Sequence, residues 1–422
     1  MDMIKDFRQW VMEDFLDVYI EFRRNNFDSF YSKIDVKKYS KMGRADRYKE
    51  LLKHFSEIQV YSKHYIKVPC MCCGKDNGNE GNHVIGNANY LKKYLSHNGH
   101  VYVLKRDFKR NFDGKDVNDP MFWSYENFKW EHRGCQTPDV TFRGFCKDCD
   151  NKLFSDIDNG IKDKKDFFKQ IYRSACSLYF RFLDQTVKKC YIADVSEDLG
   201  LSKNGWSDLM FQSEYGDIDC KPVNTKFVQG QSLYGAYQKY RITKELQAGM
   251  DYEKDAVSVA SWCVENPSIY CGMVVERQGK GKFERVNGLY RQVDHIYDVV
   301  VVLPLQKNET VVLNVTLPLG IEGHMPVAEY LSASERPDIV LTRDIVLGLG
   351  TLCDLYMSPQ FYESLPPEYL DSITDVSKHS DLPAISLFDM DFDIDRILKD
   401  ARLRQGKSGR KILSPPVQQL VD

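Results

Sequence analysis

Hydrophobic positions in the first part of the chain recur at intervals of three and four residues. The stretches FRQWVMEDFLDVYIEFRRN (residues 7–25) and ADRYKELLKHF (residues 45–55) both follow this spacing. An apolar stripe at that interval is the pattern of an amphipathic helix. Residues 1–63 are therefore predicted to form an N-terminal helical region.

The pattern changes at about residue 64. From there to residue 160, short β-type runs such as HVYVL (residues 100–104) are interspersed with Gly, Asn and Cys. Such clusters of turn-forming residues between short apolar runs are typical of loops and tight turns. We therefore expect a compact, loop-rich module over residues 64–160.

Residues 161–400 show both periodicities in succession. A segment at residues 165–187 and another within residues 233–266 have the spacing of long amphipathic helices, which predicts a helical hairpin. Valine-rich runs that predict a small antiparallel sheet follow at residues 268–277, 297–305 and 310–319. Because helices and strands are segregated along the chain, the predicted fold class is α+β. Residues 401–422 are polar and contain two prolines, which predicts a tail.

Composition limits the class of protein. The chain has 422 residues, of which 42% are hydrophobic, enough to build more than one core. It contains no apolar run of membrane-spanning length, and its first ten residues, MDMIKDFRQW, lack the apolar stretch of a secretory signal. We therefore expect a cytoplasmic protein with no membrane partner, whose 12 cysteines are ligands or core residues rather than disulfides.

The charge is unevenly distributed along the chain. The net charge is −3, yet residues 1–117 carry 22 Lys and Arg against 16 Asp and Glu. Two interpretations remain open. The basic excess either contacts a polyanion such as nucleic acid, or it is ordinary solvated surface.

Four cysteines have the spacing of a metal site. Cys70 and Cys73 form one C-x-x-C pair in CMCCGK, and Cys146 and Cys149 form a second in GFCKDCDNKLF, where a helix is expected to begin. Two such pairs supply the four soft ligands that tetrahedral zinc prefers, so we expect a structural Zn²⁺ ion. Cys72 is an alternative ligand. A weaker alternative is Cys135 together with His132.

This arrangement resembles a known family. A C-x-x-C knuckle, a His followed by two β-branched residues in NHVI (residues 82–85), and a second C-x-x-C that opens a helix are similar to the zinc-supported HNH, or ββα-metal, endonucleases. The resemblance covers residues 66–158. It implies a nuclease in which His83 is the general base that activates water. A divalent cation, Mg²⁺ or Mn²⁺, would stabilise the phosphate beside it.

The resemblance also implies further site residues. Asp150 or Asn151, in the helix after the second pair, would bind the catalytic cation, and Asn98 is the loose match for the asparagine that orients the base. The residue before the base is commonly an acidic cation ligand in this family, whereas here it is Asn82, whose amide oxygen carries no charge. His97 and His100 flank a glycine turn and are more typical of hydrogen-bonded structural residues.

Two functions of different class follow from these observations. The first is a metal-dependent nuclease acting on DNA or RNA, which the resemblance places among bacterial phage-defence effectors with a protein partner or activator. The second is a catalytically inactive zinc-module protein that binds nucleic acid or a protein as a sensor or scaffold. A carboxylate directed at His83 from the helix that follows Cys149 favours the enzyme. If Asp150 instead caps that helix, the scaffold is favoured. The sequence indicates no oligomeric state.

Overall fold

The computed structural model shows a mixed helix and strand protein with an antiparallel sheet, in agreement with the α+β class. The structure describes residues 7, 9–31, 41–43, 46, 47, 50, 66–75, 81–106, 128–137, 139–161, 164–198, 230–249, 258–264, 269–278, 283–286, 289–292, 295–306, 309–317 and 354–374. The predicted tail at residues 401–422 and most of the helix predicted at residues 45–55 lie outside these ranges.

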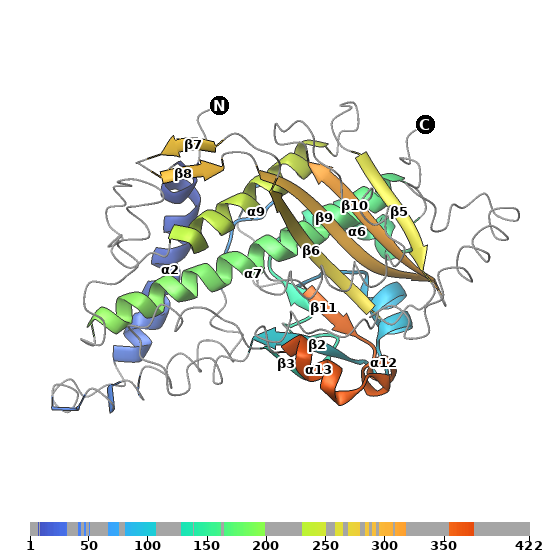
Figure 1. Ribbon diagram of the computed structural model, residues 1–422, viewed down its shortest axis with the longest axis horizontal. Helices are drawn as coiled ribbons and strands as arrows, with labels where there is room; N and C mark the ends of the chain where they lie inside the picture. The colour runs from blue at the N-terminus through green and yellow to red at the C-terminus, as the bar shows by residue number, and fades with distance from the viewer. Residues whose placement is uncertain are drawn as a thin grey trace, which may run out of the picture.

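The first predicted helix is present. It begins as a π-helix, η1 (Val11–Phe15), and continues directly as α2 (Leu16–Tyr31). Trp10, Phe15 and Phe22 are all buried, because the stripe of apolar residues faces the body of the protein. In Figure 1 this helix crosses behind one end of the long helix α7 (Lys164–Asp198), with which it is in contact.

The described residues of the module between 66 and 161 form two pairs of strands and two helices. The strands β1 (Asn82–His83) and β4 (Thr141–Phe142) pair with each other, as do β2 (His100–Arg106) and β3 (Phe128–Gly134). The π-helix η3 (Asn87–Leu95) lies between β1 and β2, and α6 (Lys147–Asp158) follows β4.

The helical hairpin is formed by α7 and α9 (Gly230–Gly249), which pack against each other. The remaining strands and helices are β5 (Ser258–Val264), β6 (Ile269–Gln278), β7 (Phe283–Val286), β8 (Leu289–Gln292), β9 (His295–Gln306), β10 (Glu309–Leu317), β11 (Asp354–Met357), α12 (Pro359–Ser364) and α13 (Pro367–Thr374). All three predicted valine-rich strands are therefore present as β6, β9 and β10. Residues 258–264, at the end of the segment expected to contain the second helix, form β5 instead.

Seven strands form one antiparallel sheet in the order β3-β2-β11-β6-β9-β10-β5. Strand β11 joins the β2–β3 pair of the module to the strands of the C-terminal half, as Figure 1 shows near the centre of the molecule. Strands on both sides of residue 160 thus share one sheet, and the division of the chain into domains at that residue stays a prediction.

Helix α7 lies at the centre of this arrangement, in contact with α2, α6, α9 and the sheet. The helix predicted at residues 165–187 is present, but its expected amphipathic character fails between residues 170 and 180, where every residue is buried. The polar residues are paired inside the protein instead. Ser174 shares a hydrogen bond of 2.9 Å with the hydroxyl of Tyr270, and Ser177 donates one of 2.7 Å to Asp354.

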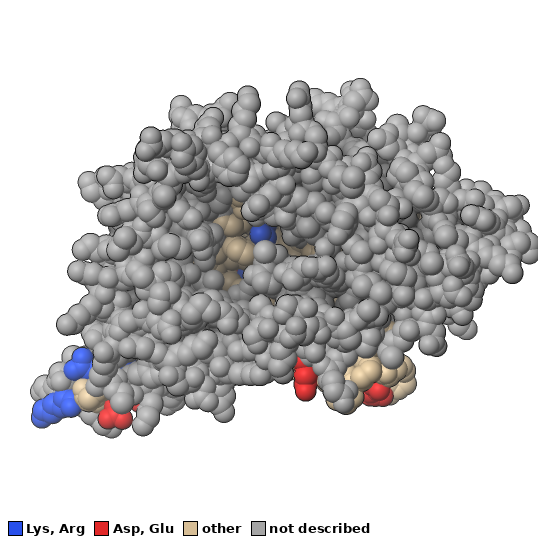
Figure 2. All heavy atoms as spheres, in the orientation of Figure 1, with Lys and Arg blue, Asp and Glu red and all other residues tan. Residues whose placement is uncertain are grey.

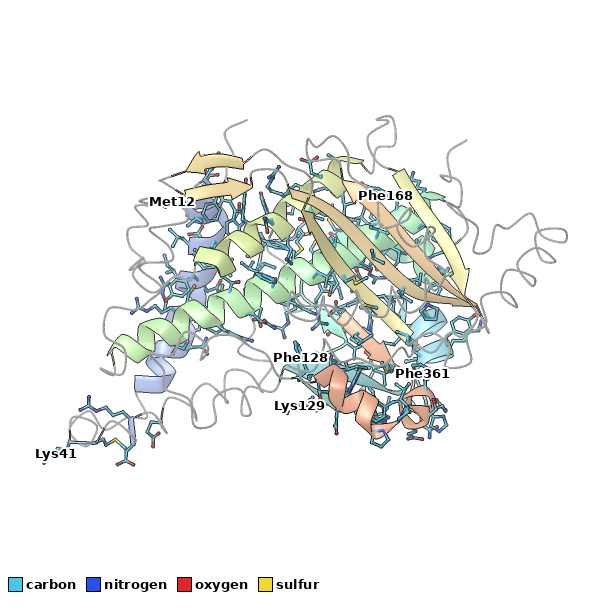
Figure 3. The ribbon with its side chains drawn as sticks, viewed as in Figure 1. Met12, Lys41, Phe128, Lys129, Phe168 and Phe361 are labelled. Carbon is cyan, nitrogen blue, oxygen red and sulfur yellow. The ribbon has the colours of Figure 1, made fainter. Side chains whose placement is uncertain are left out.

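The side chains of the described residues differ in charge between two places on the surface. Figure 2 shows basic and acidic side chains at the corner that Figure 3 marks with Lys41, and acidic and uncharged side chains over α12 and α13. None of the described helices combines the length and hydropathy that crossing a lipid bilayer requires.

Candidate metal centre and its surroundings

The first half of the metal centre is a tight turn that carries Cys70 and Cys73. The amide of Cys70 donates to the carbonyl of Lys75 at 2.7 Å, and the amide of Gly74 donates back to the carbonyl of Cys70 at 2.8 Å. These two bonds close the turn and hold both thiols on the same side. Because this turn is formed by residues close together in the chain, the C-x-x-C spacing was sufficient to predict that the two thiols lie together.

The second half is the start of α6. Cys146 is the residue that precedes the helix, its carbonyl accepts the amide of Asp150 at 2.9 Å, and Cys149 lies in the first turn. The amide of Cys146 donates to the sulfur of Cys70 at 3.3 Å. A backbone amide directed at a sulfur and a helix N-terminus both favour a thiolate, which is the form that binds metal.

The four sulfur atoms of Cys70, Cys73, Cys146 and Cys149 all lie within 4.8 Å of one another. Zinc–sulfur bonds of about 2.3 Å in a tetrahedron place the sulfur atoms roughly 3.8 Å apart. The sulfur atoms of Cys73 and Cys146 are separated by 3.8 Å. The cluster can therefore hold a metal ion such as zinc. Cys72, the alternative ligand, lies outside this group of four.

Without a cation the neighbouring thiols disfavour the ionisation of Cys149. Burial, followed by contact with the other thiols of the cluster, raises the pKa of Cys149. A bound cation reverses this effect, because a coordinating thiol loses its proton outright. The geometry thus fits a metal centre better than a group of four free thiols.

Asn82 supports this centre from β1. Its side chain is 3% exposed, and its oxygen accepts hydrogen bonds from the amides of Gly144 at 3.1 Å and Phe145 at 2.8 Å. These amides belong to the two residues directly before Cys146. Asn82 therefore fixes the loop that positions the second cysteine pair. The oxygen that was expected to bind a catalytic cation is engaged by two backbone donors, and a cation-binding role for Asn82 stays a prediction.

His83, the predicted general base, follows Asn82 on β1 and is half-buried. Burial, followed by the positive charge of Arg173, lowers the pKa of His83 from 6.5 to about 4, while Asp158 and a hydrogen bond with Gln136 act in the opposite direction. Its Nδ1 atom is buried and has no hydrogen-bond partner among the described residues. At neutral pH the ring is therefore uncharged and has a lone pair available to accept a proton.

The chain just after His83 is held by helices α6 and α7. Gln170 of α7 donates to the carbonyl of Val84 at 2.9 Å. A Cβ atom at Gly86 would lie 2.9 Å from Oδ1 of Asp158, so only glycine permits this close approach to the end of α6. Helices α6 and α7 thus fix the position of His83 from two sides.

Arg173 of α7 joins the carboxylates of α6. Its side chain is 2% exposed, and it lies 2.6 Å from Oδ1 of Asp158 and 3.6 Å from Oδ1 of Asp150. The guanidinium also lies over the ring of Phe154, 4.8 Å from its centre. Asp150 therefore pairs with Arg173. The residue before the helix, Cys146, makes no side-chain capping bond to α6. Asn151 is exposed.

Asn98, expected to orient the general base, lies in the two-residue turn between His97 and His100. The backbone amide and carbonyl groups of these histidines bond each other at 3.0 Å in both directions, and Asn98 and Gly99 have φ angles of 51° and 76°. Asn-Gly with positive φ at both positions is the preferred sequence of this tight turn. The carbonyl of Asn98 accepts a hydrogen bond from Nδ1 of His100 at 3.0 Å. Asn98 thus orients His100, and no bond between Asn98 and His83 is seen among the described residues.

Sequence reasoning missed Asp158, Gln136, Gln170 and Arg173 as neighbours of His83. None of them has a motif, and two of them lie on α7, far from His83 in the chain. The only signal for Gln170 and Arg173 was the occurrence of strongly polar residues inside an otherwise apolar helical segment, and Asp158 and Gln136 gave none. Comparison with known proteins found no matching family model, no matching curated protein and no matching solved structure.

Proposed function

We propose that the protein is a nuclease that hydrolyses phosphodiester bonds of DNA or RNA, with His83 as general base and a structural zinc ion held by the four clustered cysteines. The observation that carries the proposal is the unit formed by β1, β4 and α6. His83 lies on its first strand, paired with Thr141 of the second, and the cysteine cluster ties the start of α6 to the segment that precedes β1. Two antiparallel strands followed by a helix is the order that the resemblance to ββα-metal endonucleases implies.

The environment of His83 suits the activation of water. A general base must be unprotonated before the reaction, and burial beside Arg173 keeps the imidazole neutral. A base with a very low pKa accepts protons weakly, but a bound phosphate anion next to the ring raises the pKa toward neutrality. Asp158, whose negative charge already raises the pKa of His83, acts in the same direction.

The catalytic cation is an expectation from the resemblance. Among the described residues, the only group of three or more metal-binding side chains is the cysteine cluster. Asn82 and Asp150 are engaged by backbone amides and by Arg173, so the described residues do not form a separate oxygen site. Mg²⁺ is often bound by one or two carboxylates together with substrate phosphates. The requirement for Mg²⁺ or Mn²⁺ is therefore tested by experiment.

The test is cleavage of plasmid DNA, linear single-stranded DNA and structured RNA with Mg²⁺, Mn²⁺ or no added divalent cation. The zinc-loaded wild type is expected to cleave at least one of the three substrates, and a zinc-loaded His83→Ala variant is expected to lose cleavage. The dependence on Mg²⁺ or Mn²⁺ is read from the same assay. Absence of cleavage by a well-folded wild type, also with candidate protein activators present, would contradict the proposal.

The second candidate function is a zinc-module protein that binds nucleic acid or a protein without catalysis. The observation that favours it is Asn82, whose oxygen supports the cysteine loop where the family commonly has an acidic cation ligand. A role in phage defence stays a prediction from the resemblance under either function.

A further inference from the structure

Five rings form a continuous row across the β2–β3 pair and α12. This ring row consists of His100, Tyr102, Trp130, His132 and Tyr362. Tyr102 and His132 are opposite each other in the register of β2 and β3, and His100 is two residues from Tyr102 on the same face. Figure 3 marks Lys129 of β3 and Phe361 of α12 at this end of the molecule.

One end of the ring row is open to solvent. His100 and His132 are both exposed, and their rings are stacked with centres 4.8 Å apart and planes 13° apart. The bond from Nδ1 of His100 to the Asn98 carbonyl fixes the His100 ring in this position. The pair therefore presents a preformed stacking surface.

The other end of the row is anchored. Tyr362 stacks on Tyr102 with ring centres 3.7 Å apart, Trp130 meets Tyr362 edge to face at 5.7 Å, and all three rings are half-buried. Tyr102 lies 5.1 Å from His132 and so connects the anchored rings to the exposed pair. Little conformational entropy is then lost when a flat ligand stacks on the exposed rings.

The exposed pair is close in the fold to His83. His100 pairs with Gly134 at the end of β3, the next residue, Cys135, donates its amide to the carbonyl of Gly99 at 2.9 Å, and Gln136 hydrogen-bonds His83. Three consecutive residues thus lead from the ring row to the proposed general base.

Positive charge accompanies this path. Lys92 and Lys93 are exposed in the last turn of η3. Only four residues, Ser96 to Gly99, separate the end of that helix from His100. The carboxylate of Glu131 on the adjacent strand is paired with Lys105 at 3.5 Å and Lys129 at 2.6 Å. The charge of Lys92 acts on the His83 ring and lowers its pKa, so this lysine is near enough to the proposed general base to attract a phosphate group there.

We propose that the ring row binds unpaired bases of a single-stranded nucleic acid, which places the strand beside His83. The exposed, preformed pair of His100 and His132 at the end of the row is suited to stacking on bases, which is possible only where the bases are not paired in a duplex. The inference rests on the proposed nuclease function for its biological role, but binding itself is independent of catalysis. The alternative occupant, a proline-rich or aromatic peptide, is decided by the same experiment.

The test is fluorescence anisotropy with labelled single-stranded oligonucleotides of thymidine and of uridine, with a duplex of equal length and with a labelled proline-rich peptide. The zinc-loaded His83→Ala protein is used to prevent cleavage. Adding His100→Ala and His132→Ala is expected to weaken single-strand binding by about tenfold or more, since stacking of each base contributes substantially. Adding His100→Phe and His132→Phe instead retains the stacking surface and is expected to retain binding.

Lys41→Ala is the matched control, because Lys41 is exposed and lies at a separate corner in Figure 3. It is expected to change affinity by less than about twofold. Zinc content and thermal unfolding show whether each variant is folded. A folded His100→Ala/His132→Ala variant with unchanged affinity, a preference for duplex, or binding of a proline-rich peptide but no oligonucleotide would overturn the proposal.

The outcome also separates this inference from the proposed function. If the wild type cleaves no nucleic acid but loses single-strand binding in the alanine variant, the ring row is confirmed as a binding surface and the nuclease proposal is contradicted. If the wild type cleaves, and His100→Ala/His132→Ala changes neither binding in the His83→Ala protein nor cleavage when it is made in the wild-type protein, the nuclease proposal stands and this inference is wrong.

Discussion

The two ends of α6 differ in how their polar groups are arranged. At its start, four sulfur atoms from two separate segments converge on one point, where a metal can satisfy all of them. At its end, Asp158 is paired with Arg173 of α7 and lies near His83 of β1. The first end can hold a metal ion, whereas at the second end Asp158 is paired with a positive charge of the protein itself. We infer that one end supports the fold and the other is suited to chemistry.

The largest expected effect is at the start of α6. Cys149→Ser removes one of four ligands, and we expect metal affinity to fall by more than about 100-fold, since even outer supporting residues contribute roughly 10–100-fold. Zinc per chain, measured by elemental analysis after dialysis against a weak chelator, should drop from about one to near zero. Cys72→Ser is the matched control and should retain the metal. Equal loss in both variants would show that the ligand set is different.

The next effect is expected at Arg173, which lies 2.6 Å from Asp158 at the end of α6 and 3.6 Å from Asp150 in its first turn. Arg173→Met leaves the carboxylates of Asp158 and Asp150 without this cation, so the free energy of unfolding should fall by about 2–4 kcal/mol. Urea unfolding of the zinc-loaded proteins measures it. The zinc content should not change, because Arg173 contacts none of the cysteines in the described structure. Zinc loss together with the stability loss would mean that the two ends are not independent.

Features of α6 and its surroundings could be predicted from the sequence where the contributing residues lie close together in the chain, and not where they come from distant segments. The cysteine cluster was predicted because C-x-x-C pairs encode a local turn and a helix start, and the valine-rich strands because their apolar runs are local as well. Arg173 and Gln170 were not recognised as neighbours of His83, since their segment reads as a helix with a polar face. That helix instead lies in the interior, where α6, α9 and the sheet surround it. Burial of polar groups depends on tertiary packing, which the periodicity of one segment does not report.

Asn82 links the two regions and allows a sharper test. Asn82→Ala leaves the buried amides of Gly144 and Phe145 without their acceptor, at a cost of about 2 kcal/mol, and should weaken metal binding by roughly tenfold. Asn82→Asp keeps an acceptor oxygen in place and should retain most of the metal affinity. If Asn82→Asp instead mainly increases cleavage at low Mg²⁺ concentration, Asn82 is a cation ligand, as the sequence resemblance implied.

A further expected effect is a dependence of stability on pH that originates at His83. Its pKa is lowered from 6.5 to about 4 in the folded protein, so the unfolded chain binds a proton first as the pH falls. The contribution of His83 to stability is therefore lost between pH 6.5 and 4. The difference in unfolding free energy between wild type and His83→Gln should change in favour of His83→Gln over this interval, while effects common to both proteins, such as metal release, cancel. A constant difference would mean that the folded environment does not lower the pKa of His83.

The division of roles between the two ends of α6 is tested most directly by measuring zinc content and cleavage rate together in wild type and His83→Ala. The account predicts one zinc per chain in both proteins and a cleavage rate at least about 100-fold lower in His83→Ala, in line with the usual contribution of a general base. Equal cleavage rates in two zinc-loaded proteins would contradict the assignment of His83 as the base and of this end of the helix as the site of chemistry.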